Sequence, residues 1–311
     1  MRPLFTFASS ENCRFPRAEN GTLQRSKVAA LYSGKRPGNR SRTDVLFGMA
    51  TNVFNDWCET KKVDVTKRHK LHIFLERDGA RSVVQNRIDD TVASHYDEPA
   101  RLADRISRLG YSKAAKILRA MLPQTKRARS GQLGEILATE AVPIVLSSFD
   151  IPVKRLRWSD DREMAMRGED LIGVSTKDTP IRFLKGESKS GISISPSVVG
   201  KARAALKAND GRPSEHAMGF VMKLLADRGD DKLALVFEEY MLVKSIPPRQ
   251  LLHLMFILSG NDASTTLTDD LKGCDETIEQ HAVTLRIPDH KDFVAEVFDR
   301  VNNYASQRRR T

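Results

Sequence analysis

The longest apolar run of this 311-residue chain extends from Leu251 to Leu258 and is interrupted by His253. It is far shorter than the roughly 20 residues of a membrane-spanning helix, and its length suits a strand buried in a protein core. Three widely scattered cysteines form no CxxC pair, which favours a reducing compartment. We therefore expect a cytoplasmic protein that is built around a buried sheet, without a membrane segment or a zinc cluster.

Helical and strand patterns alternate around this run, which predicts an α/β protein with a central sheet. Apolar residues four apart indicate helices, and short apolar or alternating runs between turn residues indicate strands. We expect strands at residues 70–76, 153–158, 170–174, 180–189, 251–258 and 281–289, and helices at 81–96, 100–110, 112–122, 131–149, 196–208, 213–229 and 290–306.

The chain divides by composition into four parts. Residues 1–49 carry nine Lys or Arg and three Asp or Glu without apolar periodicity, and are expected to be a disordered basic extension. Residues 50–122 are expected to form a mainly helical N-terminal region that could dock a partner. Residues 123–305 form the predicted α/β core, and residues 306–311 a basic tail. The net charge of +11 suggests a polyanionic partner.

An acid and a base follow one of the predicted strands. The apolar run Ile181–Leu184 leads into Glu187 and Lys189, which face the same side of a strand while Ser188 faces the other. The pair indicates either a solvated strand end or a metal site. The tripeptide alone is a weak signal, because Glu59-Thr60-Lys61 has the same pattern with no apolar strand before it.

Two further acids make a metal site more specific. Asp170 begins the preceding strand, and Glu135 lies on the helix before the strands. Carboxylates are hard oxygen ligands for Mg²⁺, so Asp170 and Glu187 are candidate ligands, with Glu135 as a third. Lys189 could stabilise charge on an attacking hydroxide or in the transition state. Glu169 is a rival to Asp170, which we favour because the strand continues from it.

The order of helical Glu, strand Asp and strand E-x-K resembles the PD-(D/E)xK nuclease superfamily, whose fold many restriction enzymes share. The stretches GQLGEILATEAV, RGEDLIG, FLKGESKSG and SVVGKARAAL resemble more closely the HamA family of nucleases from the Hachiman antiphage defence system, over about residues 125–305. The chain departs from the loose superfamily pattern in one respect. The superfamily has a Pro directly before the strand acid, whereas this chain has Glu169 before Asp170.

The resemblance implies a restriction-endonuclease-like core in which Glu135, Asp170, Glu187 and Lys189 are catalytic. It also implies a superfamily 2 helicase partner, similar to HamB, that restrains or activates the nuclease. We expect Mg²⁺-dependent hydrolysis of DNA phosphodiesters, with Mn²⁺ as an alternative ion. Two other functions remain open: a non-catalytic subunit that binds DNA or a helicase, and a free-standing restriction-type endonuclease.

Two basic groups are candidate contacts for the DNA backbone. Lys126, Arg127 and Arg129 lie in a stretch, residues 123–130, that we interpret as a hinge-like polar loop. Lys201 and Arg203 lie on the helix predicted at residues 196–208. Each group could equally be a solvated surface.

Several other residues are interpreted as structural. Trp57 and Trp158 are expected to be packing residues rather than platforms for base stacking. His216, His253 and His281 lack the spacing of metal ligands and are expected to be core or surface residues.

Overall fold

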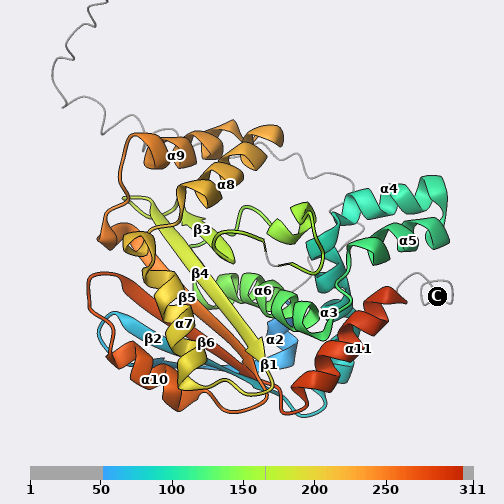
Figure 1. Cartoon of the computed structure of the whole chain (residues 1–311), viewed down its shortest axis with the longest axis horizontal. Helices are drawn as coiled ribbons and strands as arrows, with labels where there is room; N and C mark the ends of the chain where they lie inside the picture. Colours follow the sequence, from blue (N-terminus) through green and yellow to red (C-terminus); the bar gives the residue numbers. More distant parts are fainter. Residues whose placement is uncertain (1–51, 165, 304–311) are drawn as a thin grey trace, which may run out of the picture. The chain divides into compact units, whose positions relative to one another are not determined.

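A computed structural model describes residues 52–164 and 166–303 of the chain. The predictions for residues 1–49 and 306–311 concern segments outside these ranges. The structure confirms an α/β protein in which helices flank a central mixed sheet (Figure 1).

Six strands form one sheet in the order β1-β2-β6-β5-β4-β3. The four inner strands run parallel, whereas β1 and β3 pair antiparallel with their neighbours at the two edges. Every residue of β5 is buried, which confirms the buried strand predicted from the apolar run. The strands are β1 (Cys58–Asp64), β2 (His69–Glu76), β3 (Leu171–Ser175), β4 (Arg182–Gly191), β5 (Leu251–Ser259) and β6 (Glu279–Arg286).

Helices cover both faces of the sheet (Figure 1). Helices α3, α6 and α11 share one apolar core with the sheet, while α7 and α10 pack on the opposite face. Helices α8 and α9 form a third core beside β3 and β4. The helices are α2 (Val53–Trp57), α3 (Ala80–Tyr96), α4 (Pro99–Leu109), α5 (Tyr111–Met121), α6 (Lys126–Val145), α7 (Pro196–Lys207), α8 (Glu215–Asp227), α9 (Asp231–Leu242), α10 (Ser264–Lys272) and α11 (His290–Asn302).

The segment from residue 52 to residue 122 contributes strands as well as helices. Its strand β2 pairs with β6, so the central sheet continues across the predicted boundary at residue 123. Helices α4 and α5 form a hairpin in which every side chain of α4 is at least partly exposed. Gly110 joins the two helices and has a φ of 79°, a conformation that favours glycine. The α4 side of this hairpin is therefore accessible.

Two local predictions were wrong. Residues 153–158 were expected to form a strand, but Arg155–Trp158 form a 3₁₀ turn. The reason is that Arg155 and Arg157 donate hydrogen bonds to carbonyl oxygens elsewhere in the protein, which draws both side chains inward. Residues 123–130 were expected to form a loop, but α6 begins at Lys126, because the Thr125 hydroxyl accepts a hydrogen bond from the amide of Ala128.

Candidate metal centre and nucleic-acid interface

Glu187 and Lys189 lie near the end of β4, on the same face of the strand. The Lys189 ammonium pairs with a Glu187 carboxylate oxygen and also donates to the carbonyl oxygen of Ser188 at 3.2 Å. Burial raises the pKa of the Glu187 carboxyl, and the Asp170 carboxylate raises it further, whereas Lys189 lowers it. The E-x-K pair is therefore formed at a half-buried position where negative charge accumulates.

Asp170 is held against the same stretch of β4. Leu171 pairs with Gly186 in the antiparallel register, so Asp170 lies beside the E-x-K sequence. An Asp170 carboxylate oxygen accepts a hydrogen bond from the Ser188 amide at 2.9 Å and contacts the Ser188 hydroxyl at 3.3 Å. A Cβ atom at Gly186 would lie 2.9 Å from the Leu171 Cβ, so glycine permits this close approach of β3 to β4.

Glu169 has a different role from its neighbour. Its carboxylate accepts hydrogen bonds from the amide of Ser214 at 2.8 Å and from the Ser214 hydroxyl at 2.9 Å. The Lys185 ammonium lies 3.7 Å from a Glu169 carboxylate oxygen. Glu169 thus joins the start of α8 to the sheet, whereas Asp170 faces the E-x-K strand.

Glu135 lies on α6 near these groups. The helix packs closely on β4, since a Cβ atom at Gly134 would lie 3.0 Å from the Ser190 Cβ. Burial raises the pKa of Glu135 to about 8, Arg155 opposes this shift, and Asp170 and Glu187 add to it. The carboxyl groups of Glu135, Asp170 and Glu187 therefore act on one another electrostatically.

Arg155 was not predicted as a site residue. Its Nε atom lies 3.2 Å from a Glu135 carboxylate oxygen, but neither atom makes a well-oriented hydrogen bond. Its guanidinium also donates to the backbone carbonyls of Met166 and Glu169. The Arg155 guanidinium is therefore divided between these carbonyls and Glu135. Its positive charge offsets only part of the free-energy cost of burying an ionised Glu135 carboxylate.

The oxygen donors suit a hard divalent cation such as Mg²⁺. Asp170 and Glu187 repel each other where they are half-buried, and a buried oxygen of Glu135 lacks a hydrogen bond. A cation would relieve both conditions. Within residues 52–164 and 166–303, however, no three His, Cys, Asp or Glu side chains are already gathered as a ligand cluster. The oxygen chemistry of these donors therefore suits a metal, but Glu135, Asp170 and Glu187 are not drawn together as a three-residue cluster in the described residues.

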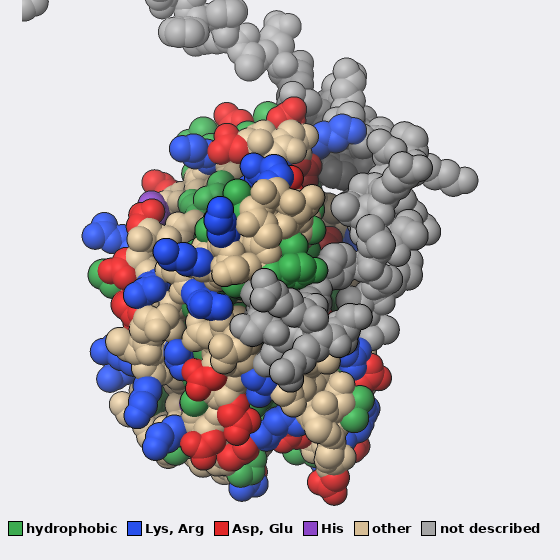
Figure 2. Space-filling view, turned by 90° about the vertical axis from the view of Figure 1, so that its right-hand side faces the viewer, with side chains coloured by type: hydrophobic (Ala, Val, Ile, Leu, Met, Phe, Trp, Pro, Cys, Tyr) green, Lys and Arg blue, Asp and Glu red, His purple; other side chains and the backbone are tan. Residues whose placement is uncertain are grey.

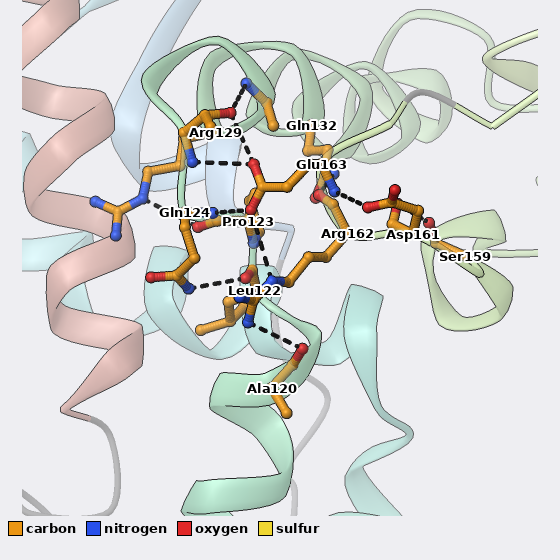
Figure 3. A network of polar contacts seen from close by, with 12 residues as sticks. Ala120, Leu122, Pro123, Gln124, Arg129, Gln132, Ser159, Asp161, Arg162 and Glu163 are labelled. Atoms are coloured by element: carbon orange, nitrogen blue, oxygen red, sulfur yellow. Dashed lines mark hydrogen bonds and ion pairs between the residues drawn. The ribbon is translucent and has the colours of Figure 1, made fainter.

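A cleft of about 500 Å³ adjoins Asp170. Trp158 and Phe220 form part of its apolar wall, together with Ile172 of β3. The loop that forms another side is anchored by Glu163, whose carboxylate accepts hydrogen bonds from the backbone amides of Gln124 and Thr125 (Figure 3). The side-chain amide of Gln132 also donates to the carbonyl of Arg162 at 2.7 Å. These contacts fix the loop to the beginning of α6.

The predicted DNA contacts differ in how exposed their side chains are. Lys126, Arg127 and Lys201 are exposed. Arg129 is mostly buried, lies 3.0 Å from a carboxylate oxygen of Asp299 and stacks over a phenylalanine ring. On the face shown in Figure 2, Lys and Arg side chains are interspersed with Asp and Glu. Of the predicted DNA contacts, Lys126, Arg127 and Lys201 are therefore the exposed ones.

Arg203 does not belong to the proposed DNA surface. It is 7% exposed, and its guanidinium pairs with Asp270 at 2.6 Å. It also donates to the side chain of Gln280 in the neighbouring strand β6. The prediction that it contacts DNA was therefore wrong, and Arg203 instead forms a structural ion pair that joins α7 to α10.

We expect Arg203→Ala to lower stability and Lys201→Ala to lower DNA binding instead. Removing Arg203 leaves Asp270 as a poorly compensated buried charge, which should lower the free energy of unfolding by about 3 kcal/mol. Removing the exposed Lys201 should leave stability within about 0.5 kcal/mol of the wild type and weaken DNA binding at low salt. Urea unfolding and DNA titration of both variants test this. Equal stability of the two proteins would show that the buried pair contributes little.

Glu135 should make the stability of the metal-free protein depend on pH. Its folded-state pKa of about 8 lies above the ordinary value of 4.5, so the stability that its proton provides is complete below pH 4.5 and is lost as the pH rises through 8. Glu135→Gln cannot ionise. In EDTA at pH 9, we expect the melting temperature of this variant to lie several degrees above that of the wild type, because each kcal/mol of unfolding free energy shifts it by about 2–4 °C. The difference should shrink towards pH 5. A difference that does not change with pH would contradict the shift.

The fold and this site together define a class. The chain is an α/β protein in which helices flank a six-stranded mixed sheet, and Asp170, just before the edge strand β3, lies against the E-x-K sequence of β4. The sequence model of the HamA family matches residues 51–301, and the chain belongs to this family. It is therefore a protein of antiphage defence. No curated protein sequence matches the chain.

The membrane prediction can also be compared with the structure. Across residues 52–164 and 166–303, no helix has both the length and the apolar character needed to cross a bilayer.

Proposed function

We propose that the protein is a metal-dependent deoxyribonuclease that hydrolyses DNA phosphodiesters during antiphage defence. The observation that carries the proposal is the hydrogen bond from the Ser188 amide to Asp170, which holds this acid against Glu187 and Lys189. Membership of the HamA family supports the biological setting.

Asp170 and Glu187 would hold Mg²⁺, or Mn²⁺ in its place, with Glu135 as a third acid that binds the ion or its water. A metal bound there lowers the pKa of a water molecule and neutralises charge on the scissile phosphate. Lys189, which already reaches Glu187 and the carbonyl of Ser188, would orient the attacking water and stabilise negative charge in the transition state. Lys126, Arg127 and Lys201 would contact the DNA backbone.

A helicase subunit would restrain or activate this nuclease. Family membership supports a defence-system subunit, and the hairpin of α4 and α5 supplies a candidate docking surface. Leu109 and Tyr111 flank its turn and are 41% and 39% exposed. Deleting residues 50–122 would remove β1 and β2 from the sheet, so surface substitutions are the appropriate test of docking. Leu109→Ser with Tyr111→Ser should reduce co-purification with the helicase while the protein remains folded.

The proposal is tested by plasmid degradation. The purified chain is assayed in Mg²⁺ and in EDTA, alone and with the helicase encoded beside it, with and without ATP. We expect cleavage that requires the divalent ion and a change in rate when the helicase is added. DNA binding without cleavage under every condition would instead support a non-catalytic binding subunit. Cleavage that the helicase never alters would support a free-standing nuclease.

A further inference from the structure

Two aromatic side chains in the lining of the cleft beside Asp170 remain partly exposed. Trp158 of the 3₁₀ turn and Phe220 of α8 meet edge to face, with ring centroids 6.4 Å apart, and both are only partly buried. Trp57 differs, because it is fully buried and stacks on Phe54. The packing role predicted for both tryptophans therefore describes Trp57 completely and Trp158 only in part.

The charges around the cleft select for a neutral ligand in its interior. Acids outnumber bases in the lining, so a phosphate group without a metal would be repelled there. A planar, uncharged group could instead lie against the apolar wall. The charged residues of the lining are Arg155, Arg167, Asp160, Asp161, Glu169 and Asp170.

We propose that this cleft binds an unpaired nucleobase of the DNA strand that is cut. The inference rests on the proposed nuclease function and specifies its substrate. Asp170 borders both the cleft and the E-x-K strand. A strand whose phosphate lies at Asp170 and Glu187 can thus place an adjacent base against Trp158 and Phe220. Aromatic side chains bind successive bases of single strands by stacking, with little dependence on sequence.

This geometry predicts the form of DNA that is cut. A base inside a duplex is paired and stacked, and extracting it costs free energy that an unpaired base does not require. The preferred substrate is therefore a single strand, or a duplex end that has been unwound. The cleft volume of about 500 Å³ lies within the usual range of about 300–1,000 Å³ for ligand sites, which leaves room for one nucleoside.

Binding can be measured apart from catalysis. Lys189→Ala protein, in which cleavage is expected to be strongly reduced, is titrated in the presence of Ca²⁺ with a fluorescein-labelled 12-mer of thymidylate, and the anisotropy gives Kd. Adding Trp158→Ala or Phe220→Ala should weaken binding at least about fivefold, whereas Trp158→Phe should restore most of it. A duplex of the same length should bind with little dependence on Trp158. Equal Kd values for folded Trp158→Ala protein and its parent would overturn the proposal.

Tryptophan fluorescence provides a second measurement that does not depend on the alanine variant folding. The chain has two tryptophans, and Trp57 is inaccessible. The thymidylate 12-mer should quench the fluorescence of Lys189→Ala protein, and Trp158→Phe should abolish this quenching. Absence of quenching at saturating DNA would overturn the base site.

The cleavage assay separates this proposal from the proposed function. If Glu187→Gln loses cleavage while Trp158→Ala cuts a single strand at the wild-type rate, the nuclease assignment stands and the base site is wrong. If Glu187→Gln itself cuts DNA normally, the nuclease site is wrong, whatever Trp158 does.

Discussion

Replacing Glu187 by Gln or Lys189 by Ala should reduce DNA cleavage by at least about a hundredfold in Mg²⁺. The first substitution keeps the shape of the side chain but removes the charge proposed to hold a cation, and the second removes the ammonium proposed to lie beside the reacting phosphate. Neither side chain belongs to an apolar core cluster. The melting temperature should therefore change by only a few degrees. Initial rates on a labelled DNA strand provide the measurement.

The chain supplies a matched control in its other E-x-K sequence. Glu59 and Lys61 lie on the edge strand β1 with the same spacing, and both are exposed. Glu59→Gln and Lys61→Ala make the same chemical changes away from Asp170, so both variants should cleave at the wild-type rate. If both pairs of substitutions lowered the rate equally, the loss would reflect total charge rather than a catalytic site.

The neighbouring acids Glu169 and Asp170 should separate activity from stability. Asp170→Asn removes a proposed metal ligand but retains an oxygen that can accept from the Ser188 amide, so we expect cleavage to fall by at least about a hundredfold with the fold intact. Glu169→Gln weakens the bonds to Ser214 at the start of α8 and should destabilise the protein by about 1–2 kcal/mol while cleavage continues. Rates and urea unfolding of the two variants test the distinction.

The reverse pattern would identify Glu169 as the ligand. An active Asp170→Asn protein and an inactive, stably folded Glu169→Gln protein would require the metal to lie towards α8 and Lys185. The structural contacts of Glu169 in the free protein would then have to be exchanged for the metal.

Local sequence patterns predicted correctly where the candidate residues Glu187 and Lys189 lie on their strand. Alternation along β4 places Glu187 and Lys189 on one face, and the break before Leu171 marks where Asp170 stands. The role of Glu169 could not be predicted, because its partner Ser214 is 45 residues away. Arg155 was missed for the same reason, since its contact with Glu135 depends on how a 3₁₀ turn packs against α6.

Arg203 is different, because its burial could have been predicted. Val199, Ala202, Arg203 and Leu206 follow the spacing of a single inward helical face, and all four are buried in α7. Lys201 lies outside that stripe and is exposed. Helical periodicity was thus a stronger signal than the clustering of basic residues in the sequence.

The missing elements have equally physical causes. Strand β1 (CETKKVD) is polar and mostly exposed, because it is an edge strand held by its pairing with β2. Such a strand carries no apolar alternation to reveal it. Helices α9 and α10 were also not predicted. Each has a buried apolar side chain in a core cluster, Phe237 in α9 and Leu267 in α10.

Direct metal binding tests the central claim independently of any partner. Mn²⁺ is titrated into Lys189→Ala protein, which retains all three acids, and free Mn²⁺ is followed by electron paramagnetic resonance with a short DNA strand present. The signal should fall as the ion binds. Adding Asp170→Asn and Glu187→Gln should abolish that binding, whereas adding Glu169→Gln should preserve it. Unchanged Mn²⁺ binding after loss of both Asp170 and Glu187 would contradict a metal-dependent nuclease site at these residues.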